Sequence, residues 1–130
     1  MFLKRNIWFT GHSLGGALAT LAADRCIRQG AMLGLGDLGG VYTFGSPLVG
    51  NRHFADGFNS RVRGRSFRFV NDQDGVTKVP PQFLGYCHVN TERFVGEDGP
   101  GLPFSEALID HTPRRYAVLV WNALVDAAGV

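Results

Sequence analysis

The stretch that decides the fold is TGHSLGGALATLAA, residues 10–23, where a glycine-rich turn runs straight into a helix-forming segment. Before it, NIWFT at residues 6–10 is apolar and rich in β-formers, which predicts a buried strand. Residues 13–29 predict a helix. Ser13 therefore lies where a strand turns sharply into a helix, inside the pattern Gly-x-Ser-x-Gly. Such a turn lifts a serine side chain clear of a sheet, which makes Ser13 the first candidate functional residue.

Two interpretations of Ser13 follow from this stretch. As a nucleophile, Ser13 would need room on either side, and we expect Gly11 and Gly15 to supply it because side chains there would clash in the tight turn. The backbone N–H of Leu14 would then face a developing oxyanion, which the helix N-terminus also favours. The alternative is an ordinary serine N-cap after a glycine turn.

A serine nucleophile needs a histidine base, and the chain holds four histidines. His12 adjoins Ser13 and cannot fold back onto its hydroxyl in a useful geometry. His53 falls in a predicted helix and is expected to be solvated, whereas His88 falls in an extended run and is expected to be packed. His111 lies in a loop before the last predicted helix, where catalytic groups commonly lie. We therefore favour His111 as the base, with an ordinary loop histidine as the alternative.

Two carboxylates, Asp72 and Asp74, directly follow the strand predicted at residues 67–71. The carboxyl ends of parallel strands form one edge of an open α/β sheet, so either carboxylate would share that edge with Ser13. The order Ser, Asp, His along the chain is the one found on α/β-hydrolases. The pattern of residues alone leaves both carboxylates open as the acid.

The periodic patterns predict an α/β fold with a mostly parallel sheet and flanking helices. Strands at residues 6–10, 41–44 and 67–71 alternate with helices at 13–29 and 51–59. The predicted loops are residues 31–40, 72–82 and 97–103.

The C-terminal part of the chain predicts a hairpin and one more helix. YCHV at residues 86–89 and ERFV at 92–95 predict an antiparallel hairpin. The last helix has a clear start, because Thr112 can cap it and Pro113 suits its first position. From there to residue 127 the pattern is apolar on nearly every side, which predicts a helix that is buried or meets a partner.

The composition limits the classes of function. The chain has 130 residues, which suggests one domain, and its net charge of +2 argues against nucleic acid as a partner. No apolar run approaches the roughly 18 residues of a membrane span, and residues 1–12 do not resemble a signal peptide, so localisation stays open. Cys26 and Cys87 predict free, buried thiols. The basic run at residues 61–68 would suit an anionic surface, but a solvated loop is the simpler interpretation.

Four stretches, in order, make the chain similar to the class 3, fungal-type triacylglycerol lipase family of the α/β-hydrolase fold. They are TGHSLGGALATLAA, YTFGSPLVGNRHFA, FRFVNDQDGVTKVPP with GYCHVNTE behind it, and DHTPRRY. The resemblance implies Ser13 as nucleophile, Asp74 as acid and His111 as base. Asp74 is preferred because the family places its acid three residues after the Val-Asn pair. The other implied site residues are the oxyanion-hole donor Leu14 and the nucleophile elbow Gly11, His12 and Gly15.

The resemblance further implies a carboxylic ester hydrolase that acts on acylglycerol or related esters through an acyl-enzyme, with no cofactor and no metal. Its partners would be a lipid or small ester substrate and, transiently, a lipid interface. Family members are longer, with earlier strands that supply a second oxyanion donor and a lid. We therefore expect residues 1–130 to form a single truncated α/β-hydrolase domain. The alternative is a non-catalytic domain of the same fold that is stabilised as a homodimer.

The chain departs from the family pattern at two places. Residues 45–51 read GSPLVGN, so Leu48 stands where the family usually has the arginine of GSPRVGN. At residues 74–81 the chain reads DGVTKVPP, where DPVPRLPP or DIVPHLPP is common in the family. We expect these changes to alter loop packing or the acyl pocket and to leave the three site residues in place.

Overall fold

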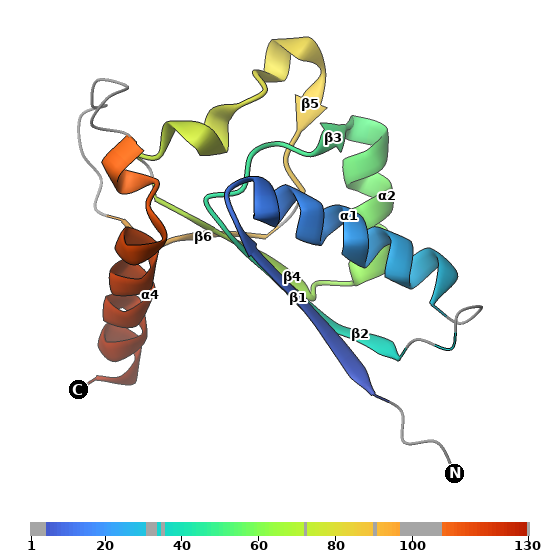
Figure 1. The fold of residues 1–130 in the computed structure, drawn as a ribbon, viewed down its shortest axis with the longest axis horizontal. Helices are drawn as coiled ribbons and strands as arrows, with labels where there is room; N and C mark the ends of the chain where they lie inside the picture. The colour runs from blue at the N-terminus through green and yellow to red at the C-terminus, as the bar shows by residue number, and fades with distance from the viewer. Residues whose placement is uncertain are drawn as a thin grey trace.

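The structure, a computed structural model, describes residues 5–30, 34, 36–71, 73–89, 91–96 and 108–129. Within them, a parallel sheet has the strand order β1-β2-β4-β6 (Figure 1). Its strands are β1 (Asn6–His12), β2 (Asp37–Phe44), β4 (Ser66–Val70) and β6 (Glu92–Phe94). The connecting helices are α1 (Leu14–Gln29) and α2 (Arg52–Val62). The predicted α/β fold with a mostly parallel sheet is confirmed.

Strand β2 begins earlier than the sequence predicts. The sequence predicts a loop at residues 37–40, yet they belong to β2, where residues 37, 38 and 40 pair with β1 and the register shifts past Gly39. The glycines serve this pairing, because a Cβ added at Gly39 or Gly40 would lie 2.6 or 2.8 Å from the ring of Trp8. Residues 31–33 and 35 of the predicted loop lie outside the described residues, as does the loop predicted at 97–103.

The antiparallel hairpin predicted from residues 86–95 does not form. Its first half, β5 (Tyr86–Cys87), pairs antiparallel with β3 (Gly50–Asn51), and its second half, β6, pairs in parallel with β4. The buried guanidinium of Arg68 on β4 explains the difference. It donates to the carbonyl oxygen of Val89 at 2.6 Å and to the carboxylate of Glu92 at 2.9 Å, which holds this segment along β4.

The chain between β4 and β5 is a loop, as predicted, with two short 3₁₀ turns. These are η1 (Gly75–Lys78) and η2 (Gln82–Leu84). Leu48 is buried, and its backbone N–H donates to the carbonyl of Val79 in this loop at 2.8 Å.

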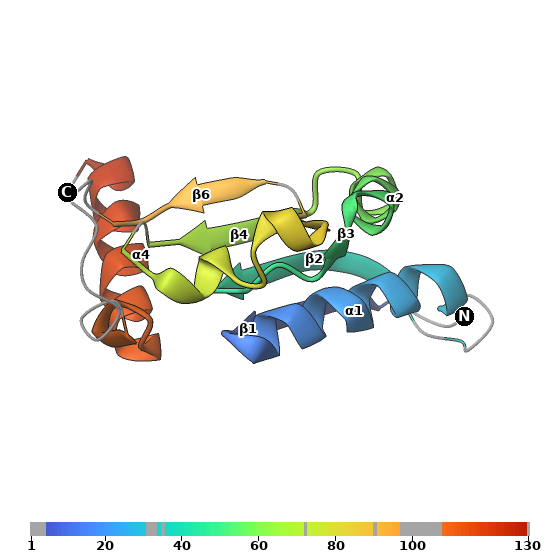
Figure 2. The same cartoon turned by 90° about the horizontal axis from the view of Figure 1, so that it is seen from above.

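One face of the sheet carries the hydrophobic core beneath α1 and α2 (Figures 1 and 2). The buried cluster consists of Ala23, Leu38, Val41, Ala55, Phe58, Val62 and Val89. The buried Asp24 of α1 also faces inward, and it accepts hydrogen bonds from Arg28 on its own helix and from Arg61 on α2. Leu18 and Leu21 instead face solvent.

Three of the four arginines in the basic run at residues 61–68 have partners within the fold and Arg63 is exposed, which argues against the run as an anionic-surface site. Arg61 binds Asp24, Arg65 donates to two backbone carbonyls, and Arg68 pairs with Glu92. Burial lowers the pKa of the Arg68 guanidinium, although the hydrogen bond that Arg68 donates to Glu92 opposes that shift.

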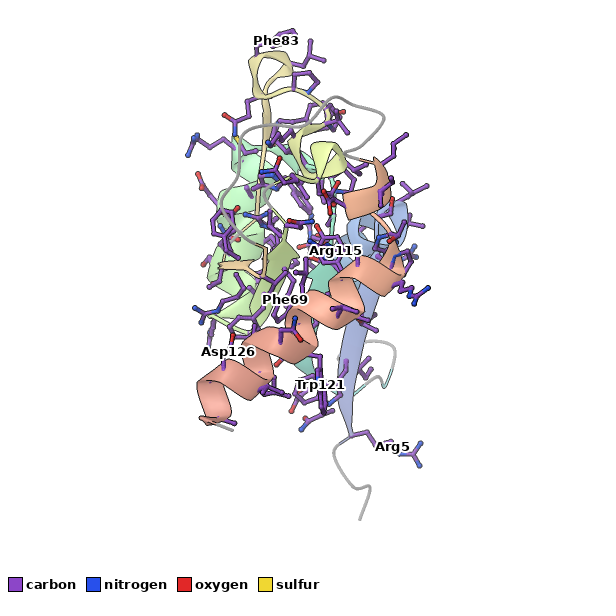
Figure 3. All side chains as sticks on the ribbon, turned by 90° about the vertical axis from the view of Figure 1, so that its left-hand side faces the viewer. Arg5, Phe69, Phe83, Arg115, Trp121 and Asp126 are labelled. Atoms are coloured by element: carbon purple, nitrogen blue, oxygen red, sulfur yellow. The ribbon has the colours of Figure 1, made fainter. Side chains whose placement is uncertain are left out.

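The other face of the sheet is aromatic. Neighbouring rings on it lie 5.0–6.5 Å apart between centroids. They belong to Trp8, Tyr42, Phe44, Phe67 and Phe69. The helix α4 (Pro113–Ala128) lies on this face near the carboxyl ends of the strands (Figures 1 and 3). Trp8 is 59% exposed, so α4 covers only part of the aromatic surface within the described residues.

The start of α4 is confirmed. Of the two outcomes expected for its apolar sides, full burial within the chain is wrong, and contact with a partner stays a prediction. Thr112 accepts a hydrogen bond from the backbone N–H of Arg115, and Pro113 occupies the first turn. Tyr116 and Leu119 are buried, whereas Trp121 is 64% exposed and other apolar side chains also face outward. The helix contacts the sheet along one face only, so its second apolar face has no neighbour in the described part of the chain.

Both cysteines are free, as predicted, but only Cys26 is buried and Cys87 is half-buried. Among the described helices, none is long and apolar enough to cross a membrane. The same residues contain no cluster of three or more histidine, cysteine or acidic side chains that could hold a metal ion.

Candidate active site

Ser13 occupies a strained turn between β1 and α1. Its backbone has φ 56° and ψ −132°, a conformation that non-glycine residues rarely adopt. The turn is held by the Ser13 N–H, which donates to the carbonyl of Phe44 on β2 at 2.9 Å. Ser13 stands at the N-cap position of α1, yet its side chain makes no capping hydrogen bond. Its Oγ lies 2.7 Å from Nε2 of His111 instead, which argues against the simple N-cap interpretation.

The glycines of the elbow have different roles from those expected. A Cβ at Gly11 would lie 2.1 Å from the carbonyl oxygen of Gly15, so Gly11 is sterically required. A Cβ at Gly15 would meet nothing within 4 Å, which contradicts the expected steric role of Gly15. Gly16 takes that role, because its Cβ would lie 2.8 Å from Cβ of Ser46. Leu14 is the first residue of α1, where backbone N–H groups have no partner within the helix.

His111 lies between the serine and a carboxylate. Its Nδ1 is 2.8 Å from Oδ2 of Asp74, and its Nε2 is 2.7 Å from Oγ of Ser13. A carboxylate can only accept, so we assign the imidazole proton to Nδ1, and Nε2 then accepts the hydroxyl hydrogen of Ser13. The His111 side chain is 13% exposed and that of Asp74 is fully buried.

The buried carboxylate of Asp74 has three hydrogen-bond donors. Besides His111, the Tyr116 hydroxyl donates to Oδ2 at 2.7 Å and the Val76 N–H donates to Oδ1 at 2.9 Å. Thr77 adds a bond to the main chain, from its hydroxyl to the Asp74 carbonyl at 2.8 Å. Where the family often has proline, Thr77 thus makes a bond that proline could not make. Asp72, the other carboxylate considered from the sequence, lies outside the described residues.

Tyr116 is a site residue that sequence reasoning missed, because it was read only as part of an apolar helix face. Its hydroxyl accepts from the backbone N–H of Asn71 at 3.0 Å and donates to Asp74. Burial raises the pKa of the Tyr116 phenol far above its ordinary value, and the Asp74 carboxylate raises it further. Tyr116 therefore keeps its proton and stays a donor. The sequence signal for this role was a tyrosine in an otherwise apolar helix face, one turn after the N-cap Thr112.

Gly45 was also missed as a site residue. It follows β2 with φ 59°, and a Cβ there would lie 2.7 Å from Oδ2 of Asp74 and 3.1 Å from Cε1 of His111. Only glycine leaves this space for the bonded pair. The available signal was the Gly-Ser-Pro turn at the end of the second predicted strand.

The other three histidines have different surroundings. His53 is exposed, as predicted. His88 is half-buried, and its Nε2 donates to the carbonyl of Thr77 at 2.7 Å. Burial lowers the pKa of His88, and the nearby charge of Arg68 lowers it further. His12 contacts His111, with the two ring centroids 4.6 Å apart.

An apolar pocket of about 350 Å³ lies next to these residues. It is lined by His12 and Phe44 at the ends of β1 and β2, and by one side of α4 from Pro113 to Leu124. His12 and Tyr116 are the lining residues that also contact His111 or Asp74.

A serine hydroxyl, an imidazole and a carboxylate bonded in series form the arrangement that activates a serine nucleophile. Here Ser13 follows β1, Asp74 follows β4, and His111 lies just before α4. All three are at the carboxyl edge of the parallel sheet. This fold and this arrangement define the class of α/β-hydrolases.

The class 3 lipase family model, described as Lipase (class 3), matches residues 3–84, and the chain belongs to this family. The secreted mono- and diacylglycerol lipase 1 of Fusarium solani is 41% identical over 91 residues, which are 70% of this chain and 25% of the relative. A lipase of Rhizopus niveus is 40% identical over 118 residues, which are 90% of this chain and 29% of the relative.

A solved triacylglycerol lipase, whose catalytic centre is described as a serine protease triad, is similar with a TM-score of 0.59 and 38% identity. The match covers 69% of this chain and 33% of that chain. This chain therefore spans between a quarter and a third of the length of these relatives.

Proposed function

We propose that this chain hydrolyses carboxylic esters of the acylglycerol type, with Ser13 as nucleophile, His111 as general base and Asp74 as the acid that orients His111. The observation that carries the proposal is the series of two hydrogen bonds, 2.7 Å from Ser13 Oγ to His111 Nε2 and 2.8 Å from His111 Nδ1 to Asp74 Oδ2. The absence of a capping bond from Ser13 supports it, because the hydroxyl is directed to the base.

In the proposed acylation step, Oγ of Ser13 attacks the ester carbonyl carbon while Nε2 of His111 takes the hydroxyl proton. The carbonyl oxygen becomes an oxyanion, and the imidazolium is stabilised by the Asp74 carboxylate. When the tetrahedral intermediate collapses, the bond to the alkoxy oxygen breaks and His111 gives its proton to the departing alcohol. Ser13 is left as an acyl ester.

In the proposed deacylation step, His111 takes a proton from water, whose oxygen attacks the acyl carbon. The second tetrahedral intermediate collapses, the carboxylic acid leaves, and His111 returns the proton to Ser13. No cofactor takes part in this scheme.

We assign the Leu14 N–H as an oxyanion donor in both steps. Leu14 follows the nucleophile at the first position of α1, so its N–H is free of an intrahelical partner and lies at the positive end of the helix dipole. The strained φ of Ser13 supports this assignment, because such a turn brings the hydroxyl and the next N–H to the same side.

The substrate class rests on the relatives, which include mono- and diacylglycerol lipases. Two exposed apolar side chains are close in sequence to Asp74 and His111. Their exposure agrees with transient contact at a lipid interface. Phe83 is 87% exposed on η2, at the outer end of the loop that carries Asp74 (Figure 3), and Ile109 is 67% exposed two residues before His111.

The proposal is tested by hydrolysis of p-nitrophenyl butyrate. We expect Ser13→Ala to lower kcat by about 10⁴-fold or more, because the nucleophile is removed. Ser60→Ala, at an exposed position of α2, is the matched control and should leave the rate unchanged. Equal rates in the wild type and Ser13→Ala would refute the role of Ser13. A wild type without turnover would favour the alternative, a non-catalytic domain that dimerises.

A further inference from the structure

His12 touches His111 at two points that the proposed mechanism does not use. Its Nε2 lies 2.5 Å from the main-chain carbonyl oxygen of His111. The two ring planes are tilted by 35° with centroids 4.6 Å apart. A carbonyl oxygen can only accept, so His12 carries a proton on Nε2 and donates it to this bond.

The nucleophile elbow therefore contacts both the side chain and the main chain of His111. Ser13 binds the imidazole of His111, and the preceding residue, His12, binds its main chain. Both come from one turn, which the Ser13 N–H fixes to β2 at 2.9 Å. A displacement of the His111 loop away from β1 must break both contacts together.

Among the described residues, the other hydrogen bonds of this loop do not tie the His111 main chain to the nucleophile elbow. Asn71 reaches the carbonyl of Asp110 with a long contact of 3.3 Å, and Thr112 closes a local turn on Ile109 at 3.2 Å. Neither bond joins the loop to β1 or α1, where the nucleophile lies.

We propose that His12 is a positioning residue. It fixes the main chain of His111 relative to the elbow, so that the imidazole meets Ser13 Oγ and Asp74 Oδ2 at the same time. The inference rests on the proposed function for its effect on rate, but the position of the ring can be measured without turnover.

The surroundings of His12 allow a matched pair of variants. The ring faces the apolar pocket and lies 5.9 Å from the ring of Tyr116, edge-on. Phenylalanine therefore suits the space and lacks the donor. Glutamine places an amide N–H near the position of the histidine Nε2 and keeps the donor. His53→Gln, at the exposed histidine of α2, is the control.

We expect His12→Phe to lower kcat for p-nitrophenyl butyrate by about 10- to 100-fold, because a displaced base loses near-attack geometry. KM should change less than about twofold, because His12 does not bind substrate in this scheme. His12→Gln should recover most of the rate, and His53→Gln should match the wild type. An unchanged kcat in His12→Phe, or a His12→Gln variant as slow as His12→Phe, would overturn the inference.

Ring nitrogen NMR of His111 separates this inference from the proposed function. The wild type and His12→Gln should show a fixed Nδ1–H tautomer, and His12→Phe should show averaged ring signals. A wild type without turnover, with ring signals that change in His12→Phe, would refute the proposed function and support the positioning role. An active wild type with the same fixed tautomer in His12→Phe would refute the positioning role alone.

Discussion

The two faces of the sheet contribute differently to the molecule. The face beneath α1 and α2 is filled by closely buried side chains, with Val41, Phe58 and Val62 all 0% exposed. The opposite face is a row of aromatic rings, half-buried except for the exposed Trp8, and α4 packs on it near the strand ends. On the first face most of the buried side chains are apolar, whereas Tyr116, the innermost side chain of α4, is bonded to Asp74.

This difference indicates that one side of the sheet mainly stabilises the fold, whereas the other side mainly aligns the candidate site residues. The face with α1 and α2 supplies most of the apolar burial and presents Ser13 at the end of β1. The face with α4 buries little but holds the base and the acid. The candidate site lies at the carboxyl edge of the strands, where the two faces meet.

The largest expected effect concerns the buried face. Phe58→Ala should lower the free energy of unfolding by about 3–5 kcal/mol, because it removes a fully buried ring beside Phe54. Phe67→Ala on the aromatic face is the matched control and should cost about 1 kcal/mol. Urea unfolding of both variants measures the difference. Equal losses would contradict the assignment of the core to one face.

The next largest effect concerns the α4 face. Tyr116→Phe should lower kcat by about tenfold, because Asp74 loses a charge-assisted hydrogen bond and Asn71 loses its acceptor. Tyr42→Phe, within the aromatic row, should leave kcat unchanged. The measurement is steady-state ester hydrolysis at saturating substrate. A Tyr116→Phe variant that loses stability and keeps full kcat would show that α4 is only a packing element.

The smallest effect concerns His88, which supports the loop carrying Asp74. Burial and Arg68 lower the pKa of His88, while the Thr77 carbonyl and Glu92 oppose the shift. The unfolded chain therefore binds this proton more readily, so stability is greatest above about pH 6.5 and falls as the pH drops below that value. His88→Gln, which keeps a donor to Thr77, should reduce this dependence.

The difference in urea midpoint between pH 7.5 and 5.5 measures the effect, in the wild type and in His88→Gln. The exposed His53→Gln serves as the control, and it should keep the dependence of the wild type. A His88→Gln variant with the same pH dependence as the wild type would show that other groups cause it.

The parts of the fold that follow local rules could be predicted from the sequence. The strand, turn and helix around Ser13 were predictable because apolar periodicity and glycine placement act over a few residues. The start of α4 was predictable for the same reason, since Thr112 and Pro113 are local signals. The proximity of Asp74 and His111 to Ser13 followed from the rule that strand ends share one edge, together with the resemblance to the family.

The errors concern contacts between segments distant in the chain. The hairpin failed because Arg68 on β4 binds residues 89 and 92, and no local pattern encodes that pairing. Gly15 was expected to be required because it lies two residues after Ser13, as Gly11 lies two residues before it. In the structure, Ser46 approaches Gly16 closely instead. The role of Tyr116 could not be predicted because a tyrosine in an apolar helix face is interpreted as a packing residue. Its hydroxyl partner, Asp74, is known only from the structure.

The central claim is that Ser13 is an activated nucleophile, and covalent labelling tests it most directly. The protein would be treated with a fluorophosphonate at pH 7.5, and the adduct located by peptide mass spectrometry, with His111→Ala as the comparison. We predict one adduct per chain, on Ser13, and little or none in His111→Ala within the same time. No adduct on the wild type, or equal labelling of both proteins, would contradict the account.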